Sequence, residues 1–344
     1  MGCQETYVCI RKGNPMKAGQ VVERERIEIV EAERPDLALE RTDPDGLKDL
    51  VLVRTVNAAI CGSDHPLFTG PANYPAPPGV SLHESIGVIE KSWSNGCREG
   101  DLVLALPSGS SAMAEYFLGL GTSVTPLPKG LPQEQLLMAQ PLGTVLYCLR
   151  KLGHWFNAEV AIVGQGPMGL LFTAMMRNLG AALIIGIDQH DNRLAAAKEM
   201  GATHTVNSAG TDPVEAVTEI TDGRMADVVI EVVGVEETFN LCVKLARRNA
   251  RFINFGVPKT TQYTADIFDL FRKNIQLTTS VGPDIHIDFA SAMRMIGEGR
   301  VDVSPMISHK LPFARVQEGF EMATGRKGEC IKIVIDFEEK GLGR

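Results

Sequence analysis

Two short segments in the first quarter of the chain carry side chains that suit a metal ion. Cys61 opens the segment Cys-Gly-Ser-Asp, and 22 residues later His83 and Glu84 stand side by side at the start of an apolar run. Thiolate and imidazole are ligands that zinc prefers, and a carboxylate can complete or exchange in such a site. Taken singly, Cys61 could equally be a small buried hydrophobe, and His83 a core histidine with one hydrogen bond.

A glycine-rich turn further along the chain could bind a dinucleotide. The apolar run 160–163 meets Gly164-Gln-Gly166-Pro-Met-Gly169, and residues 170–179 follow with helical spacing. In such a strand, turn and helix, Gly164 permits the turn, Gly166 lets a pyrophosphate approach the backbone, and Gly169 allows close packing. The helix start supplies free N–H groups and the positive end of the helix dipole. The plainer alternative is an ordinary strand–helix turn.

An acidic residue stands where such a site would bind the adenosine ribose. The apolar run 182–187 ends in Asp188, 24 residues after Gly164, which is where an acid that binds the ribose hydroxyls is expected. Because Asp188 would repel a 2′-phosphate, the sequence predicts NAD as the cofactor. His190 and Arg193 lie close behind and could soften that repulsion, so NADP stays an alternative.

The elements around these residues predict two kinds of architecture. Residues 16–59 show short strands and turns without a helical period, which indicates a mainly β first part. From residue 160 onward strands and helices alternate, and this alternation predicts a parallel, doubly wound sheet. Further strands are expected at 202–206, 226–234, 251–256 and 275–280, helices at 193–200, 241–247 and 284–299, and a last strand, returning to the first part, at 331–335.

Composition excludes several classes of partner. The chain has 344 residues and a net charge of −8, and no basic cluster is dense enough to follow a phosphate backbone, so no nucleic acid is expected. No apolar run reaches the ~18 residues of a membrane span, and no charged-then-apolar leader opens the chain, so no membrane is expected. The seven cysteines are scattered, which indicates a reducing cytoplasm. The start Met1-Gly2-Cys3 matches the short, loose N-myristoylation pattern.

Several separate motifs, in order, identify the chain as a member of a known family. Between residues 16 and 337 it resembles the medium-chain dehydrogenase/reductase superfamily, in particular its zinc-dependent alcohol, polyol and sugar dehydrogenases. The resemblance implies an α/β chain with a GroES-like, mainly β catalytic domain at 1–157 and 301–344, and a Rossmann dinucleotide-binding domain at 158–300. The motifs that carry it are Cys61-Gly-Ser-Asp, His83-Glu84, Gly100-Asp101, Ala114-Glu115-Tyr116, Gln140-Pro141-Leu142, the glycine turn at 164–169, and Ile307-Ser-His-Lys-Leu-Pro312.

The resemblance implies one catalytic zinc ion on Cys61 and His83, with Glu84 as a direct or exchanging ligand. The remaining family ligand is usually Cys, Asp or Glu just before Pro-Leu. Here that position is Gln140, a weaker and uncharged donor that some sugar dehydrogenases of the family share. Many relatives hold a second, structural zinc on four closely spaced cysteines, but none stands between 101 and 114. This lobe is therefore expected to be shortened and to lack the ion.

The resemblance also implies roles in the reaction. Ser63 matches a hydroxyl that accepts the substrate proton and hands it toward the cofactor ribose, and Asp64 matches an acid that orients the zinc-bound histidine. Two positions depart from the family pattern. The usual glycine before the His-Glu pair is Leu82, and the relay histidine is replaced by Pro66. His65, one position early, either relays the proton or lines the mouth of the cleft.

The cofactor contacts implied by the resemblance come from both domains. Thr144 would pack against the nicotinamide ring, and Lys332 would approach both the cofactor diphosphate and Glu84. Zinc would act as a Lewis acid on the substrate oxygen, while the cofactor performs the hydride chemistry. The residues expected to bind the cofactor are Thr144, Gly164, Gly166, Pro167, Met168, Gly169, Asp188, Arg193, Val233, Gly256, Val257 and Lys332.

These inferences predict a zinc-dependent oxidoreductase that transfers a hydride between a secondary alcohol, of polyol or sugar-like kind, and NAD(P). Its partner is then a small alcohol or carbonyl substrate, and a homo-oligomer is expected, either a dimer through the edge of the cofactor sheet or a tetramer. Two alternatives stay open. One is a zinc-free reductase of the same superfamily, and the other is a non-catalytic dinucleotide-binding redox sensor, which would fit if Gln140 and the missing relay histidine meant lost activity.

Overall fold

The computed structural model describes residues 14–37, 49–153, 155–325 and 330–338. Its contacts divide the chain into two compact units: unit 1 comprises Met1–Leu137 and His309–Arg344, and unit 2 comprises Met138–Ser308. Met1-Gly2-Cys3, which matches the N-myristoylation pattern, lies outside the described residues. The compact units divide at 137/138 and 308/309. The boundaries between the catalytic and the dinucleotide-binding domain, expected at 157/158 and 300/301, stay a prediction.

Unit 1 is built on a six-stranded sheet, in which strand order is β13-β14-β3-β4-β5-β6. Strand β3 pairs antiparallel with both β4 and β6, and β5 pairs with β4 and β6 in turn. The four strands β3, β4, β5 and β6 therefore form a closed barrel-like arrangement. A separate hairpin, β1 with β2, completes the β structure. The strands are β1 (Pro15–Glu23), β2 (Arg26–Glu33), β3 (Leu50–Ala59), β4 (Glu84–Ser92), β5 (Leu102–Pro107), β6 (Tyr116–Pro126), β13 (Ile307–Pro312) and β14 (Lys332–Asp336).

The mainly β character expected for this part of the chain is confirmed, and its helices are short. The helical segments are η1 (Gly62–Asp64), α1 (His65–Thr69), η2 (Ser108–Ser110), α2 (Gln133–Leu137), η5 (Phe313–Arg315) and α10 (Val316–Gly325). Strand β3 is buried along nearly its whole length. It therefore forms the centre of the unit, and it positions the residues that follow its carboxyl end.

Unit 2 contains the predicted parallel sheet, with strand order β12-β11-β10-β7-β8-β9. Because the chain moves from β7 to β8 and β9 on one side, and later to β10, β11 and β12 on the other, the order reverses beside β7. Ligands of doubly wound sheets bind at such a point, outside the carboxyl ends of the strands. The strands are β7 (Glu159–Val163), β8 (Leu183–Asp188), β9 (His204–Asn207), β10 (Ala226–Glu231), β11 (Ala246–Asn254) and β12 (Gln276–Thr279).

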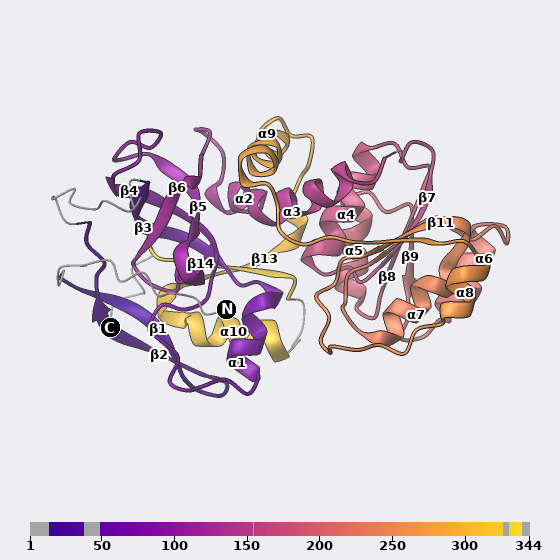
Figure 1. Ribbon diagram of the computed structural model, residues 1–344, viewed down its shortest axis with the longest axis horizontal. Coiled ribbons are helices and arrows are strands. Elements are labelled where there is room, and N and C mark those ends of the chain that lie inside the picture. Colours follow the sequence, from indigo (N-terminus) through magenta and orange to yellow (C-terminus); the bar gives the residue numbers. More distant parts are fainter. Residues whose placement is uncertain (1–13, 38–48, 154, 326–329, 339–344) are drawn as a thin grey trace. The chain divides into compact units, whose positions relative to one another are not determined.

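Helices cover both faces of this sheet, with α4 and α5 on one face and α7 on the other (Figure 1). Local signals fix several of their ends; for example, Asp212 accepts hydrogen bonds from Val214 N and Glu215 N, and Pro213 occupies the first turn of α6. The helices of unit 2 are α3 (Ala139–Arg150), α4 (Pro167–Asn178), α5 (Asp191–Glu199), α6 (Pro213–Ile220), α7 (Glu236–Leu245), α8 (Ile267–Arg272), η3 (Ile285–Phe289), α9 (Ala290–Gly297) and η4 (Ser304–Met306).

Two predicted helices of unit 2 had wrong boundaries. The helix expected at 241–247 begins five residues earlier, at Glu236, and ends at Leu245, because Ala246 and Arg247 already belong to β11. The single helix expected at 284–299 is instead a π-helical turn, η3, followed by α9. Within the described residues, no helix has both the length and the apolar character that crossing a bilayer requires.

Candidate functional site

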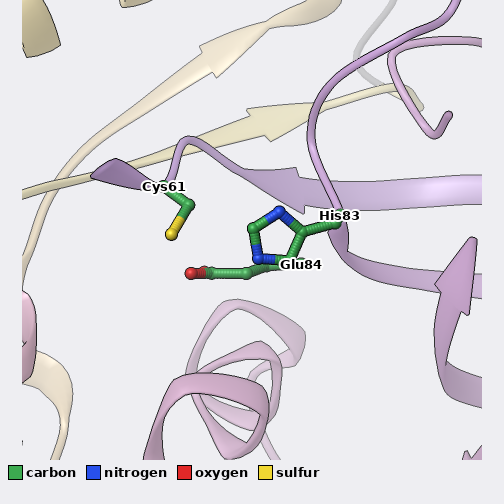
Figure 2. Close-up of side chains that lie close together, drawn as sticks. All are labelled: Cys61, His83 and Glu84. Carbon is green, nitrogen blue, oxygen red and sulfur yellow. The ribbon is translucent and has the colours of Figure 1, made fainter. Parts of the chain in front are cut away.

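The three predicted metal ligands of unit 1 converge because of strand pairing. Antiparallel pairing places Ala59, the last residue of β3, opposite Glu84, the first residue of β4. Cys61 follows the first strand and His83 precedes the second, so the thiol, the imidazole and the carboxylate meet at one end of the sheet. One donor atom from each lies within 4.8 Å of the others. Figure 2 shows the three side chains directed toward one another.

The donor chemistry fits a zinc ion. A thiolate, an imidazole and a carboxylate form a common type of zinc ligand set, and donor atoms that all lie within 4.8 Å of one another are near enough to share one ion. Glu84 is 1% exposed, whereas Cys61 and His83 are half-buried. Cys61, His83 and Glu84 could therefore hold the metal from one side and leave its other side accessible.

Lys332 forms a buried ion pair with the carboxylate of Glu84. Strand β14 pairs antiparallel with β3, which brings Lys332 Nζ to 2.6 Å from Glu84 Oε2 and lets it donate to Ile60 O at 3.0 Å. Burial by itself would lower the pKa of Lys332, but the negative charge of Glu84 and its hydrogen bond oppose this effect, and the pKa is raised. The expected approach of Lys332 to Glu84 is thus present as a buried ion pair, while the expected contact of Lys332 with a cofactor diphosphate stays a prediction.

The thiol of Cys61 is held in its protonated form without a metal ion. Desolvation, and then the negative charge of Glu84, raise the pKa of Cys61 to about 12, although the charge of Lys332 and a hydrogen bond from Ser63 oppose this shift. A cation bound to the sulfur would have to displace this proton. Ser63 is exposed beside the thiol, in η1, where its hydroxyl can also reach a ligand.

Asp64 connects the two ligand segments through their backbones. Its Oδ2 accepts a hydrogen bond from Cys61 N at 2.8 Å, and its Oδ1 accepts from Ser81 Oγ at 2.7 Å and from Leu82 N at 3.1 Å. His83 Nδ1 lies 4.0 Å from Oδ1, which is too far for a hydrogen bond. Asp64 therefore fixes the backbone on both sides of the site, while its role in orienting a zinc-bound His83 stays a prediction.

The segment before His83 has an unusual backbone. Ser81 and Leu82 have φ values of 125° and 61°, a region that favours glycine and is costly for other residues. Leu82 is nevertheless completely buried, in a core cluster that includes Phe68 and Phe320. Packing of the leucine side chain and the two hydrogen bonds to Asp64 offset the strain. This is the position at which the family usually has glycine.

In unit 2 the glycine turn has the geometry that its sequence predicts. Gly164 has a φ of 97°, and a Cβ on Gly169 would lie 1.8 Å from Gly164 O, so both positions require glycine. A Cβ on Gly166 would meet no atom closer than Arg193 Nη1 at 3.9 Å. The space above Gly166, at the start of helix α4, is therefore open to a phosphate group.

Asp188 closes this turn from the end of β8. Its Oδ2 accepts a hydrogen bond from Gln165 N at 2.7 Å, and its Oδ1 accepts from Gln189 N and His190 N. Arg193 Nη1 lies 3.7 Å from Oδ2. Asp188 is 8% exposed, so it both fixes the turn and keeps limited capacity to accept further hydrogen bonds.

The other expected site residues lie in the two units as follows. Gln140 and Thr144 are on α3 of unit 2, where Thr144 Oγ1 donates to Gln140 O at 3.4 Å. Val233 follows β10, and Gly256 and Val257 follow β11, at the carboxyl ends of adjacent strands. Their contacts with a cofactor, and the contact of Gln140 with a metal ion, stay predictions.

Comparison with known proteins agrees with this geometry. Residues 47–140 match the family model of the alcohol dehydrogenase GroES-like domain, and residues 167–298 match that of the zinc-binding dehydrogenase. The chain belongs to the medium-chain dehydrogenase/reductase superfamily. Members of this superfamily combine the two domains, so the expected α/β class, with a GroES-like and a Rossmann part, is confirmed.

Relatives within the superfamily match nearly the whole chain. An alcohol dehydrogenase of Cupriavidus necator is 28% identical over 93% of this chain and 98% of its own length. Sorbitol dehydrogenase 2 of Saccharomyces cerevisiae is 28% identical over 87% of this chain and 95% of its own. Among solved structures, an alcohol dehydrogenase from Thermus sp. ATN1 has a TM-score of 0.81 and 24% identity, and covers 93% of this chain and 99% of its own.

A buried acid that the sequence does not single out lies at the end of β10. Glu231, the last residue of β10, is completely buried and binds four backbone N–H groups through its side chain and its carbonyl. In the sequence Glu231 stands between Ile230 and Val232, inside the strand expected at 226–234, and nothing distinguishes it there from a surface acid.

Proposed function

We propose that the protein is a zinc-dependent dehydrogenase that transfers a hydride between a secondary alcohol and NAD(P). The observation that carries the proposal is the convergence of Cys61, His83 and Glu84 within 4.8 Å, in a chain that also has a dinucleotide-type glycine turn. The zinc-free reductases of the superfamily generally lack this ligand set, so its presence favours the metal-dependent reaction. The relatives named alcohol and sorbitol dehydrogenase support a polyol or sugar-like alcohol as substrate.

The residues that would hold zinc are Cys61, His83 and Glu84, with Gln140 as a further, uncharged candidate. Bound there, the ion would supply a Lewis acid for the substrate oxygen, and NAD(P) would accept the hydride. The Lys332 ammonium lies 2.6 Å from Glu84 Oε2 and also acts on Cys61. With the Cys61 thiolate and the Glu84 carboxylate as ligands, the two negative charges would balance those of the zinc ion, whereas exchange of Glu84 for solvent would leave the zinc site net positive.

The substrate proton would be moved by this chain's own hydroxyl and solvent. Ser63 is exposed next to Cys61, which suits a group that accepts the alcohol proton and passes it toward the cofactor ribose. Asp64 keeps the ligand segments fixed while this happens. His65, at the start of α1, is a candidate for the next step of the relay, and solvent is the alternative.

The cofactor would bind over unit 2 with its diphosphate at Gly166 and the start of α4. Asp188 would bind the adenosine ribose, which favours NAD over NADP. Arg193 partly compensates the charge of Asp188, so the preference is expected to be moderate. Thr144, Val233, Gly256 and Val257 are proposed to contact the nicotinamide half, and Pro167, Met168 and Gly169 to shape the phosphate turn.

A homodimer is proposed through the edge of the unit 2 sheet. Strand β12 is an edge strand with mostly exposed residues. Large apolar side chains are exposed beside it: Ile267, Phe268 and Phe271 on α8 are 66%, 72% and 83% exposed, and Leu277 is 46% exposed. The outer edge of β12, with apolar side chains exposed around it, is suited to pair with the same strand of a second copy.

A cytoplasmic location is proposed because no disulfide joins the cysteines in the described part of the chain.

The function is tested by supplying zinc-loaded protein with NAD or NADP and a panel of polyols, sugars and amino alcohols, and following the absorbance of reduced cofactor. We expect NAD reduction with at least one secondary alcohol. If zinc and NAD bind but no alcohol in a broad panel is oxidised, the redox-sensor alternative is favoured; protein that binds no zinc yet reduces activated double bonds is instead a reductase.

A further inference from the structure

Glu231 is a buried acid that the proposed reaction does not use. It ends strand β10 and is 0% exposed. Its Oε1 accepts three hydrogen bonds, from Val233 N at 2.8 Å, Gly234 N at 2.9 Å and Thr238 Oγ1 at 2.7 Å. Burying a carboxylate is costly unless donors compensate it, and here three donors converge on one oxygen. The side chain therefore fixes the loop that follows its own strand.

The backbone of the same residue holds a second loop. Phe255 N and Gly256 N both donate to Glu231 O at 2.9 Å. This second loop follows β11, which lies next to β10 in the sheet, with Asn254 in register with Glu231. One residue thus binds the loops at the carboxyl ends of two adjacent strands, the first through its carboxylate and the second through its carbonyl.

The second carboxylate oxygen fits closely against Gly256. Oε2 is buried and has no hydrogen-bond partner among the residues that the structure describes. A Cβ on Gly256 would lie 2.4 Å from Gly234 N, 2.6 Å from this oxygen and 2.8 Å from Val233 N. The carboxylate and the backbone of the first loop together fill the volume that any other residue at 256 would need, so the two loops are packed against each other and against Glu231.

We propose that Glu231 is a positioning residue for the nicotinamide half of the dinucleotide. The inference rests on the proposed function, and it follows from the strand order. Asp188 ends β8, on one side of β7, whereas Glu231 ends β10 on the other side. Because a dinucleotide lies across the point where strand order reverses, the adenosine half on the Asp188 side leaves the nicotinamide half to the loops that Glu231 holds.

The test compares two ligands that share the adenosine half. Glu231→Asp keeps the charge but shortens the side chain by one methylene, so its carboxylate no longer reaches Val233 N and Gly234 N. Binding of NADH and of AMP is measured by titration calorimetry on the full chain. We expect Glu231→Asp to weaken NADH binding by about tenfold, the effect of losing one or two hydrogen bonds, while AMP affinity stays within about twofold.

A matched variant separates positioning from general stability. Glu231→Gln keeps an oxygen at the Oε1 position, so it should retain NADH affinity within about threefold. If Glu231→Asp does not fold, Thr238→Val removes one donor to the same oxygen and should weaken NADH binding by about threefold without affecting AMP. Hydrogen exchange of the amides of Val233 and Gly234 gives a second readout, and it should be faster in Glu231→Asp without any cofactor present.

The outcomes are distinguishable. Equal loss of NADH and AMP affinity would show a merely structural role and overturn the inference, as would unchanged NADH affinity in both Glu231→Asp and Thr238→Val. Wild-type protein that binds AMP and NADH normally, but oxidises no alcohol, would contradict the proposed function and leave this inference standing. Wild-type protein that binds no dinucleotide would overturn both.

Discussion

Lys332 Nζ lies 2.6 Å from Glu84 Oε2, and the two side chains are 2% and 1% exposed. The strand pairing that creates this contact, β14 with β3 and β3 with β4, is the same pairing that brings Cys61 and His83 together. The ion pair therefore belongs both to the core of unit 1 and to the metal site. Its buried charges are costly unless each has its partner.

Breaking this pair from one side should strongly destabilise the protein. Lys332→Met leaves the Glu84 carboxylate buried without its cation, so we expect unit 1 to lose about 3–5 kcal/mol of unfolding free energy. The measurement is urea denaturation in the presence of a chelator. Lys332→Met with Glu84→Gln, which removes both charges, should recover most of the loss.

Lys310→Met is the matched control for this prediction. Its Nζ lies 3.0 Å from Asp336 Oδ2, but its side chain is 44% exposed, so the cost should be below about 1 kcal/mol. Equal effects of the Lys310 and Lys332 substitutions would contradict the role assigned to burial.

Zinc binding should release the thiol proton of Cys61. Because the pKa of the metal-free thiol is raised to about 12, the group is protonated throughout the neutral range, and its proton must leave when a metal binds. Apparent zinc affinity should therefore rise by about tenfold per pH unit between pH 6 and 8, above any contribution from His83. Calorimetry in two buffers of different ionisation enthalpy measures the protons released.

Cys97→Ser is the control for proton release. It leaves the three metal ligands in place, so it should release as many protons on binding zinc as the wild type does. Zinc binding by the wild type without net proton release at pH 8 would mean that the thiol is already ionised, or that it is not a ligand.

Leu82 allows backbone strain and side-chain burial to be measured separately. Leu82→Ala removes the buried side chain but keeps the φ of 61°, and should cost about 2–5 kcal/mol. Leu82→Gly removes the same contacts and also relieves the strain, so it should be at least as stable as Leu82→Ala, although glycine normally costs about 1 kcal/mol relative to alanine. Chemical denaturation of the two variants gives the difference. An alanine variant more stable by about 1 kcal/mol would show that this position is not strained.

Arg193 should control how strongly the protein rejects NADP. Its Nη1 lies 3.7 Å from Asp188 Oδ2 and is the cation that compensates this carboxylate. In Arg193→Ala we expect NADPH affinity to fall by about threefold to tenfold more than NADH affinity, because a 2′-phosphate would then meet the uncompensated carboxylate. Fluorescence titration with both reduced cofactors measures the ratio.

Lys198→Ala is the matched control, since Lys198 is an exposed cation on the same helix, α5. It should leave the ratio of NADPH to NADH affinity unchanged. If the wild type binds NADPH much more tightly than NADH, the role given to Asp188 is wrong.

The local features of the fold were predictable because they depend on neighbouring residues. In the strand, turn and helix around Gly164 and Gly169, both positions need glycine for steric reasons. The spacing of these glycines in the sequence is therefore enough to predict the turn. The short strands expected within residues 16–59 are also present, and the last of them is β3. By contrast, the sequence did not separate β1 from β2, whose turn passes through Glu25 at a φ of 60°, because no glycine or asparagine marks that turn.

The parts that depend on strand order were less accessible. The partner of Glu84 lies 248 residues later (332 − 84), and only the pairing of β14 with β3 brings it into contact. The hydrogen bonds of Asp64 to the segment before His83 were not predictable for a similar reason, because they join two segments that only the fold brings together. Glu231 was missed because its function depends on the neighbouring strand β11.

The central claim is that Cys61, His83 and Glu84 hold a zinc ion that the reaction requires. The direct test measures zinc content by mass spectrometry and NAD reduction in the same purified samples of wild type, Cys61→Ser, and the control Cys97→Ser, which changes a cysteine of the same unit outside the ligand set. We predict about one zinc ion per chain in both the wild type and Cys97→Ser, with equal rates of NAD reduction. In Cys61→Ser we predict less than about a tenth of the wild-type zinc content and of the wild-type rate. Two results together would contradict the account: wild-type protein that holds no zinc, and a variant with both Cys61 and His83 replaced that keeps the full rate of the wild type.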